Sequence, residues 1–209
     1  MELTNPQRVR KLAGDLIRKP GNAPRYLAHN LLRRRSPLDL GLPWFSYEAI
    51  DFLSGFLRPD MSVFEFGSGG STLFFARRCA RIESVEDDPG WAARVRERIQ
   101  KVGLTNAEIV ERPFDFEAPA GFEKSAYLAQ VRRFHHDVIV VDGADNDYTI
   151  RPLCFRVAEE QIKPGGIIVV DDSWRYQGLR RDHRAQSLKI FESVGPARFG
   201  VTSTDVYFY

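Results

Sequence analysis

Apolar and polar positions follow two different rhythms along residues 45–209. Short, nearly continuous apolar segments predict buried strands at 62–66, 81–85, 107–110, 137–141 and 167–170. Between them, apolar residues recur with helical spacing, which predicts helices at 47–57, 70–79, 89–102, 124–134, 149–162 and 179–193. Strands that are apolar along their whole length and separated by helices are typical of a parallel sheet covered by helices on both faces.

The last part of the chain follows a different pattern. Residues 163–166, Lys-Pro-Gly-Gly, predict a turn before the last buried strand. Beyond it, two short segments at 198–202 and 205–209 flank the polar pair Ser203 and Thr204. This arrangement predicts a hairpin, and hence antiparallel strands at one edge of the sheet.

Residues 5–35 predict two helical segments, interrupted at 19–24 by two prolines and a glycine. In the first segment basic residues lie opposite an apolar face, which is formed by Val9, Leu12, Ala13, Leu16 and Ile17. Helices this short need tertiary support, so we expect them to pack on the rest of the chain or on a partner. We therefore divide the chain into a basic helical extension, residues 1–43, with a linker at 36–43, and a main domain, residues 44–209.

Charge is distributed unevenly along the 209 residues, whose formal net charge is only +2. Residues 1–36 carry a net charge of +7, which leaves −5 for the rest of the chain. A basic extension on an acidic body can contact an anionic membrane surface, nucleic acid or an acidic protein, or can simply be a solvated helical face. The two cysteines lack metal-binding spacing, and the first residues lack the apolar segment of a signal peptide, so we expect a cytoplasmic protein.

The most informative stretch is 63–76, VFEFGSGGSTLFFA, which predicts a strand, a glycine turn and a helix. Glycines allow a ligand to approach the backbone, and the N-terminus of the next helix presents free N–H groups. Glu65 lies two residues before the first glycine, Gly67, where its charge would repel a phosphate. The position therefore favours a ligand with a positive charge or N–H donors, and the alternative is a glycine turn that serves packing alone.

A second acidic residue, Glu86, ends the next predicted strand in the segment SVEDDP. An acidic side chain at this position can accept hydrogen bonds from both hydroxyls of a ribose. Asp88, directly before a proline, is expected to cap the following helix. Glu65 and Glu86 together indicate a ligand that combines a cationic group with a nucleoside.

Four segments in this order, VFEFGSGGST, SVEDDP, DVIVVDGADNDY and IKPGGIIVVDDSW, resemble the class I S-adenosylmethionine-dependent methyltransferases. The resemblance implies a three-layer, Rossmann-like α/β fold, in which a seven-stranded, mostly parallel sheet ends in a C-terminal antiparallel hairpin. It also implies the cofactor S-adenosyl-L-methionine, bound by the glycine loop and the strand ends. The cofactor-binding residues would be Glu65, Gly67, Ser68, Gly69, Ser71, Thr72, Glu86, Asp87, Arg112 and Asp142.

Further carboxylates end the strands at 137–141 and 167–170: Asp142 after the first, and Asp171 and Asp172 after the second. Such carboxylates repel one another unless a positive group lies among them, and Mg²⁺ is a common solution. The arrangement is similar to metal-dependent O-methyltransferases of the catechol and caffeoyl-CoA type, which implies Asp142, Asp171 and Asp172 as metal ligands. Those enzymes carry a basic lysine where this chain has Asp145. Asp142, Asp145 and Asp171 are therefore the catalytic candidates, while His183 as base and chemistry without a metal are the alternatives.

The segment after Asp172 carries aromatic and basic residues, namely Trp174, Arg175, Tyr176, Arg180 and Arg181. They predict a substrate pocket with aromatic walls and guanidinium groups that bind anions, with packing at the end of a helix as the alternative. Trp44, just before the main domain, either packs in the core or covers the cofactor.

We expect an enzyme, an S-adenosylmethionine-dependent methyltransferase that transfers a methyl group to a hydroxyl of a small-molecule acceptor, with metal assistance as an open question. The alternatives are a methyltransferase that acts on a macromolecule such as RNA, and a non-catalytic or membrane-associated module that binds S-adenosylmethionine. Nucleic acid is the less favoured partner because the main domain is acidic. Peripheral membrane or protein contact through residues 8–35, and a homodimer, remain open.

Overall fold

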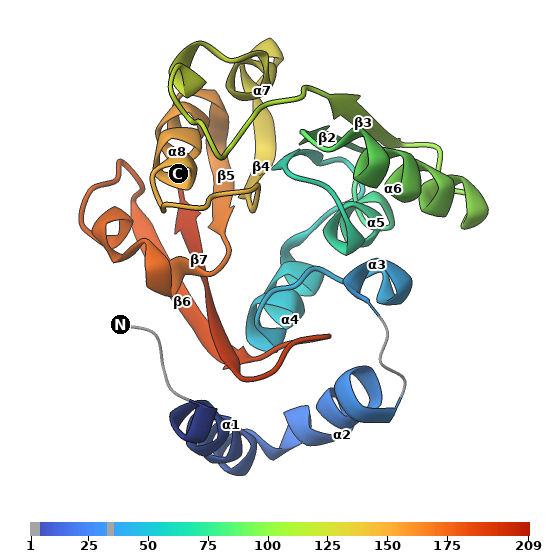
Figure 1. The fold of residues 1–209 in the computed structure, drawn as a ribbon, viewed down its shortest axis with the longest axis vertical. Coiled ribbons are helices and arrows are strands. Elements are labelled where there is room, and N and C mark those ends of the chain that lie inside the picture. The colour runs from blue at the N-terminus through green and yellow to red at the C-terminus, as the bar shows by residue number, and fades with distance from the viewer. Residues whose placement is uncertain (1–4, 33–35) are drawn as a thin grey trace.

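The computed structural model describes residues 5–32 and 36–209, and within them seven strands form one sheet at the centre of the molecule (Figure 1). The strands are β1 (Ser62–Phe66), β2 (Arg81–Glu86), β3 (Ala107–Glu111), β4 (His136–Val141), β5 (Ile162–Val170), β6 (Ser187–Val194) and β7 (Val201–Phe208). Their order is β3-β2-β1-β4-β5-β7-β6. Strands β1 to β5 are parallel, and β7 runs antiparallel to both of its neighbours. The predicted fold class, a mostly parallel seven-stranded sheet with a C-terminal antiparallel hairpin, is confirmed.

Helices cover both faces of this sheet. The α-helices are α1 (Asn5–Arg18), α2 (Ala23–Leu27), α3 (Pro37–Leu40), α4 (Tyr47–Phe56), α5 (Gly70–Ala76), α6 (Pro89–Lys101), α7 (Ala126–Ala129) and α8 (Ile150–Gln161). Shorter helical turns are η1 (Pro20–Asn22), η2 (Ala28–Leu32), η3 (Phe122–Lys124), η4 (Gln130–Arg133), η5 (Ser173–Arg175) and η6 (Gln177–Arg180). Helices α4 and α5 share one hydrophobic core with the sheet, α7 and α8 share a second, and residues of α3, α5, α6 and β3 form a third, smaller one.

The first two of these cores explain why the central strands are apolar at nearly every position. In β4, Val138 and Val140 enter the core beneath α4 and α5, whereas Ile139 and Val141 enter the core beneath α7 and α8. Successive side chains of a strand point to opposite faces, so a strand covered on both faces needs apolar residues throughout. Glu65 and Glu86 interrupt this pattern near the carboxyl ends of β1 and β2, whereas Glu83, inside β2, is buried and accepts a hydrogen bond from Gln130 at 2.9 Å.

The C-terminal hairpin uses strands other than those expected from the sequence. β6 occupies residues 187–193 of the stretch predicted as a helix at 179–193, and β7 continues through Ser203 and Thr204, where a turn is predicted. Both predictions are wrong, and for β7 the structure shows the reason. The polar residues of β7 are buried because their hydroxyl groups bond to side chains at the end of β5: Ser203 to Ser173 at 2.7 Å and Thr204 to Asp171 at 2.9 Å.

The N-terminal helices pack on this hairpin and on α4 (Figure 1). Asp15 of α1 is buried and accepts a hydrogen bond from the backbone N–H of Val194 at 3.0 Å. Arg25 of α2 forms a bidentate ion pair with Asp51 of α4, at 2.6 and 2.7 Å. The support that the short helices need is therefore supplied by the chain itself. Among the described residues, no helix has the length and apolar character needed to cross a membrane.

Only part of the predicted apolar face of α1 packs against the rest of the protein. Leu12 and Leu16 pack against the core, whereas Val9, Ala13 and Ile17 are exposed. The difference arises because the hairpin contacts only a narrow strip of the helix. Leu31 and Leu32, expected on the inner face of the second segment, have side chains outside the described residues.

Other departures from the predicted elements are local. Residues 163–166 belong to β5 rather than to a separate turn, and the helix predicted at 124–134 is broken into η3, α7 and η4. The predicted linker at 36–43 contains α3, whose first turn is closed by reciprocal hydrogen bonds between Ser36 and Asp39. This segment touches the start of α5 so closely that a Cβ atom on Gly70 would lie 2.2 Å from the carbonyl oxygen of Leu42.

Replacing Gly70 with alanine is expected to destabilise the protein by about 1–3 kcal/mol, because the new methyl group would collide with backbone oxygens that cannot rotate away. The matched control is Gly55→Ala in α4, where a Cβ atom meets nothing within 4 Å. There the expected change is a gain of about 0.5–1 kcal/mol, since alanine favours the helix. Urea unfolding measures both free energies, and equal shifts in the two variants would contradict the close approach of α3 to α5.

Candidate functional site

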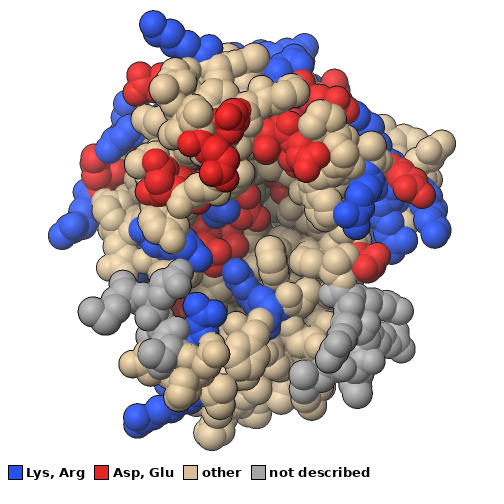
Figure 2. Space-filling view, in the orientation of Figure 1, with Lys and Arg blue, Asp and Glu red and all other residues tan. Residues whose placement is uncertain are grey.

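The acidic residues predicted at the strand ends all lie at one edge of the sheet, because β1, β2, β4 and β5 are parallel neighbours. The same face of the molecule is hollowed near its centre, with acidic side chains on one side and basic side chains on the other (Figure 2). Ligands of open α/β sheets bind at this edge, where the strand order reverses. In this sheet the reversal falls between β1 and β4.

The glycine loop between β1 and α5 is fitted tightly against the end of β4. Gly67 has φ +86°, a conformation that favours glycine, and a Cβ atom there would lie 3.2 Å from the carbonyl oxygen of Asp142. The N–H of Gly69 donates to the Thr72 hydroxyl at 3.0 Å, which fixes the start of α5. The loop therefore has little conformational freedom, and its backbone lies where the strand order reverses, between β1 and β4.

Glu65 is buried beneath this loop. One carboxylate oxygen accepts hydrogen bonds from the hydroxyls of Thr72 and Ser84, both at 2.7 Å. Burial raises the pKa of Glu65 to about 7, against the opposing effect of hydrogen bonds from Ser71, Thr72 and Ser84. The ionised form of this carboxyl group would be stabilised by one positively charged group on a ligand.

Glu86 ends β2 beside the same loop. One of its oxygens accepts from the Ser68 hydroxyl at 2.6 Å, and the other accepts from the backbone N–H groups of Asp87 and Asp88, at 3.1 and 3.2 Å. Burial raises the pKa of Glu86 and also that of the half-buried Asp87. Trp91 holds the loop from outside by donating to the carbonyl oxygen of Ser68 at 2.8 Å. Within residues 5–32 and 36–209, neither Glu65 nor Glu86 forms an ion pair.

The segment after β3 lies next to Glu86 through the backbone. The N–H of Arg112 donates to the carbonyl oxygen of Glu86 at 2.8 Å, and the Arg112 guanidinium donates to the carbonyl oxygen of Glu111. The Glu111 side chain forms an ion pair with Arg96 of α6. Arg112 thus lies near the predicted cofactor site, where its hydrogen bonds go to backbone carbonyl groups.

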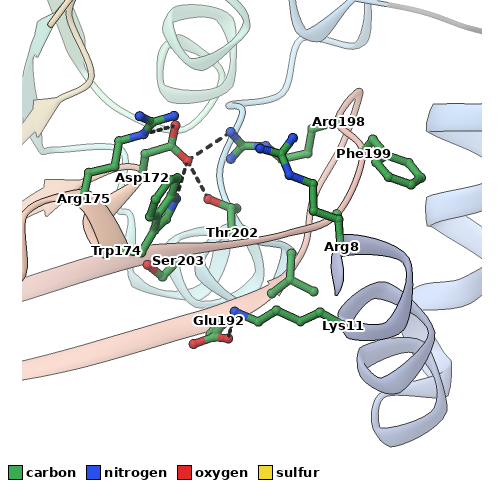
Figure 3. A pocket seen from close by; sticks show the side chains of 12 residues that line it. Arg8, Lys11, Asp172, Trp174, Arg175, Glu192, Arg198, Phe199, Thr202 and Ser203 are labelled. Carbon is green, nitrogen blue, oxygen red and sulfur yellow. Dashed lines mark hydrogen bonds and ion pairs between the residues drawn. The ribbon is translucent and has the colours of Figure 1, made fainter. Parts of the chain in front are cut away.

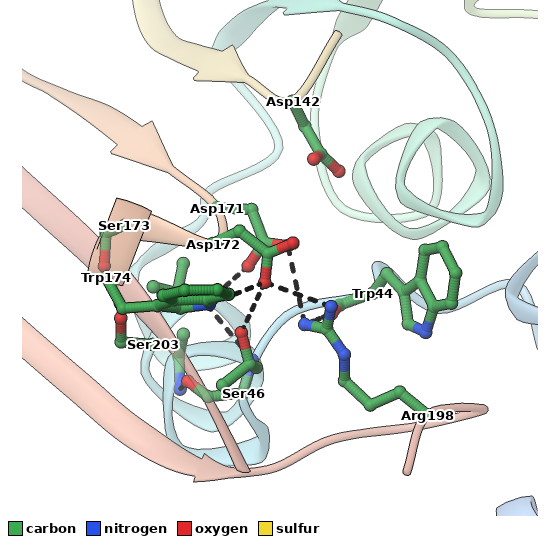
Figure 4. A network of polar contacts seen from close by, with 12 residues as sticks. Trp44, Ser46, Asp142, Asp171, Asp172, Ser173, Trp174, Arg198 and Ser203 are labelled. Atoms are coloured by element: carbon green, nitrogen blue, oxygen red, sulfur yellow. Dashed lines mark hydrogen bonds and ion pairs between the residues drawn. The ribbon is translucent and has the colours of Figure 1, made fainter. Parts of the chain in front are cut away.

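At the end of β4, Asp142 is paired with Arg151 of α8, whose guanidinium lies 3.1 Å from the carboxylate. The same guanidinium donates to the carbonyl oxygens of Gly143 at 2.9 Å and Asp171 at 3.0 Å, so it joins the ends of β4 and β5. Burial raises the pKa of Asp142, although Arg151 acts in the opposite direction. Figure 4 shows the Asp142 carboxylate pointing toward the space between Asp171, Asp172 and Trp44.

Arg198, in the loop between β6 and β7, neutralises the pair at the end of β5 (Figure 4). Its guanidinium lies 3.0 Å from the nearer oxygen of Asp172 and 3.7 Å from Asp171, and it also donates to the carbonyl oxygen of Trp44 at 3.0 Å. Asp172, with φ +48°, accepts a further hydrogen bond from Thr202 at 2.7 Å.

The two neighbouring carboxyl groups respond differently to this environment. Burial and the charges of Asp142 and Asp172 raise the pKa of Asp171 well above its usual range. Burial would also raise the pKa of Asp172, but Arg198 and the Thr202 hydroxyl hold it below its usual value. Asp172 is therefore the charged partner of Arg198, and Asp171 is the carboxyl group inclined to carry a proton.

The expected Mg²⁺ site is not supported. Within the described part of the chain, no group of three His, Cys, Asp or Glu side chains is arranged to hold a metal ion. The positive charge that Asp142, Asp171 and Asp172 require comes from Arg151 and Arg198 instead, each of which contacts carboxylate oxygens of this group.

Asp145, the other catalytic candidate, caps α8. Its two oxygens accept from the backbone N–H groups of Ile150 at 3.2 Å and Arg151 at 3.0 Å. His183, the alternative base, packs edge-on against the ring of Tyr207, with the ring centres 5.2 Å apart. Neither residue is brought into the group of carboxylates, and we retain neither as a base.

Sequence reasoning missed the residues that contact the carboxylates of this site from elsewhere in the chain: Arg151, Arg198, Thr202 and Thr204. A signal existed for Arg151, which lies at the start of the helix predicted at 149–162, directly after the loop that begins with Asp142. Arg198 lies in a loop without a motif, and only the folded hairpin brings it to Asp172.

Comparison with known proteins finds no matching family model and no match among curated proteins. Solved structures do match. A proposed O-methyltransferase from Klebsiella pneumoniae is 18% identical, with a TM-score of 0.63 over 96% of this chain and 98% of its own. A Streptococcus mutans protein described as a methyltransferase, in complex with S-adenosylhomocysteine (SAH), is 9% identical, with a TM-score of 0.57 over 78% and 97% of the two chains. An rRNA methylase from Streptococcus thermophilus is 12% identical, with a TM-score of 0.55 over 83% and 97%.

These similarities show the fold: the chain has the architecture of class I S-adenosylmethionine-dependent methyltransferases. The similar structures differ in what they act on, since they also include a precorrin-6y methyltransferase from Geobacter metallireducens, 15% identical. The fold therefore leaves the acceptor to be argued from the site.

The pKa of Glu65 predicts a specific pH dependence of stability. Because the folded protein holds the Glu65 proton more tightly than the unfolded chain, this group lowers stability as the pH rises from its ordinary pKa of 4.5 to about 7. Glu65→Gln removes the effect, so the free energy of unfolding of wild type should fall relative to the variant by up to about 3 kcal/mol across this window. Urea unfolding at several pH values measures it. The exposed Glu123→Gln is the control, and a pH-independent difference for Glu65→Gln would contradict the account.

Proposed function

We propose that this protein is a methyltransferase that uses S-adenosyl-L-methionine to methylate a hydroxyl group of a small-molecule acceptor. The supporting observation is the pair of buried carboxylates, Glu65 and Glu86, on either side of the rigid glycine loop. Both are held by hydroxyl or amide donors rather than by cations. A buried carboxylate without a cationic partner is unfavourable in the empty protein, and a ligand with complementary groups relieves that cost.

The residues at these strand ends fit S-adenosyl-L-methionine part by part. Glu65 would hold its cationic amino group, and Glu86 would accept hydrogen bonds from its ribose hydroxyls. The backbone of Gly67 to Gly69 would lie against the amino acid portion, with Ser68, Ser71, Thr72 and Asp87 nearby. Arg112 would border the base. When bound, the cofactor supplies a methyl group on a positively charged sulfur.

On the acceptor side, Asp142 is the residue best placed to remove a hydroxyl proton. Arg151 contacts one of its oxygens, the raised pKa increases its proton affinity, and its carboxylate faces the open space shown in Figure 4. Asp171 is inclined to carry a proton already, so Asp142 rather than Asp171 would take the proton of the acceptor. Trp44 and Trp174 flank the space and would exclude water from it.

The first prediction of this proposal concerns binding. Calorimetry should show that the wild-type protein binds S-adenosyl-L-methionine, and Glu86→Gln should weaken binding by about 10- to 100-fold, because hydrogen bonds to a charged acceptor are replaced by weaker ones. Glu108→Gln, on the exposed side of neighbouring β3, is the matched control and should bind as wild type does. Absence of binding to the wild-type protein at millimolar cofactor would reject the proposal.

The second prediction concerns the chemistry. With an acceptor found by screening hydroxylated compounds against labelled cofactor, Asp142→Asn should lower kcat about 100-fold while cofactor affinity stays near that of wild type, because a proton acceptor is lost. Asp147→Asn, an exposed residue of the same loop, is the control. A chelator should leave turnover unchanged in every variant. Full activity of Asp142→Asn would remove this residue from the proposed role.

A further inference from the structure

A cavity of about 320 Å³ opens beside the carboxylates at the end of β5 (Figure 3). It lies between α1, the turn η5 and the loop that joins β6 to β7. Asp172 and Thr202 form part of its wall, so the cavity continues from the group of carboxylates described above. Its volume is at the lower end of that of small-molecule sites in proteins.

The charge of the cavity is unusual for a site bordered by acidic strand ends. Among the described lining residues, Arg8, Lys11, Arg175 and Arg198 are cationic, whereas Asp172 and Glu192 are acidic. Lys11 is paired with Glu192 at 2.7 Å and Arg198 with Asp172 at 3.0 Å, so the described lining residues carry two more cations than acids after these pairs are formed. Figure 3 shows the guanidinium groups of Arg8 and Arg198 extending into the cavity from different elements, α1 and the loop after β6.

Like charges that converge from separate elements repel one another, and an anion between them relieves this repulsion. Arginine is suited to the purpose because its planar group binds carboxylate or phosphate oxygens in pairs. Arg175 is held in position by the rings on either side of it, with its guanidinium carbon 4.4 Å from the centre of the Trp174 ring and 4.9 Å from that of Tyr148. It therefore offers donors at a low cost in side-chain freedom.

Two aromatic side chains complete the cavity. Trp174 is 37% exposed and Phe199 is 59% exposed, and both form part of the lining. The Trp174 ring is oriented by its own N–H, which points at Asp172 at a distance of 3.4 Å. Large apolar surfaces left open in a cavity favour a ligand with a flat apolar part.

We propose that this cavity binds the methyl acceptor, and that the acceptor carries an oxyanion, a carboxylate or phosphate, on a flat apolar frame. That the ligand is the methyl acceptor rests on the proposed function. That it carries an oxyanion rests on the residues of the cavity alone. The proposal gives the basic helix α1 a role inside the protein: Arg8 and Lys11 form one wall of the acceptor site.

Binding of simple probes tests the oxyanion without the cofactor. Ligand-detected NMR and tryptophan fluorescence compare benzoate and phenyl phosphate with neutral benzamide. At least one of the anions should bind about ten-fold or more tightly than benzamide, and salt should weaken its binding. The stronger of the two distinguishes a carboxylate site from a phosphate site. Equal affinity for all three probes would overturn the proposal.

Variants locate the binding within the cavity. Arg8→Gln and Arg175→Gln should each weaken the preferred anion about ten-fold and leave benzamide unaffected, because each removes a charged donor. Arg10→Gln changes the same helix two residues away, outside the described lining, and should bind like wild type. An anion that binds equally well to all three variants would place the site elsewhere and contradict the proposal.

The test separates this inference from the proposed function. If the anions bind as expected but S-adenosyl-L-methionine does not, the oxyanion site stands and methyl transfer is rejected. If the cofactor binds and the anions do not, methyl transfer stands and the inference is rejected. When both bind, labelled methyl transfer should be faster to hydroxybenzoates or hydroxyphenyl phosphates than to hydroxybenzamides, and the reverse order would contradict the acceptor assignment.

Discussion

The site depends on how the carboxylates at the ends of β4 and β5 are neutralised. Asp171 is buried, and Asp142 and Asp172 lie at its side, so their mutual repulsion must be balanced by cations. Arg198 supplies one from the loop of the C-terminal hairpin, and Arg151 supplies the other from α8. Leaving such carboxylates unpaired would cost about 3–5 kcal/mol. The Arg198 loop is itself tied to the N-terminal part of the chain, because the Arg198 side chain bonds to the Trp44 backbone and Tyr26 donates to the Arg198 carbonyl oxygen. The hairpin and the N-terminal helices are thus needed for the geometry of the site.

The other half of the same edge is built in the opposite way. Glu65 and Glu86 receive hydroxyl and amide donors, and the charge of a cation is left for a ligand to provide. Under the proposed function, this half of the edge would therefore favour a ligand group with positive charge. The cavity beyond Asp172, with its excess of cations, is selective for negative charge. A cationic methyl donor and an anionic acceptor would each bind at the end of the site that carries the opposite charge. This arrangement would position both of them for transfer of the methyl group.

Local sequence patterns are sufficient to predict much of this fold and the position of the residues in one half of the candidate site. The strands that are apolar throughout, the glycine loop and the acids Glu65 and Glu86 all follow from residues close together in the chain. The two errors that bear most on the site, the turn at Ser203 and Thr204 and the metal, share a cause, since they concern polar residues whose partners are distant in sequence. Ser203 and Thr204 resemble a turn until β7 is placed beside β5, and three carboxylates suggest a metal until Arg198, 26 residues after Asp172, is brought among them. Nor does periodicity reveal that α1 faces a cavity with Arg8 and Lys11.

The most direct test of the central claim is a crystal structure of the protein with SAH. The account predicts that the amino group of this ligand lies within hydrogen-bond distance of Glu65, with its ribose hydroxyls on Glu86 and its sulfur toward Asp142. It further predicts that Arg198 keeps its contact with Asp172 in the complex. A ligand bound away from the ends of β1 and β2, with both glutamates untouched, would contradict the account.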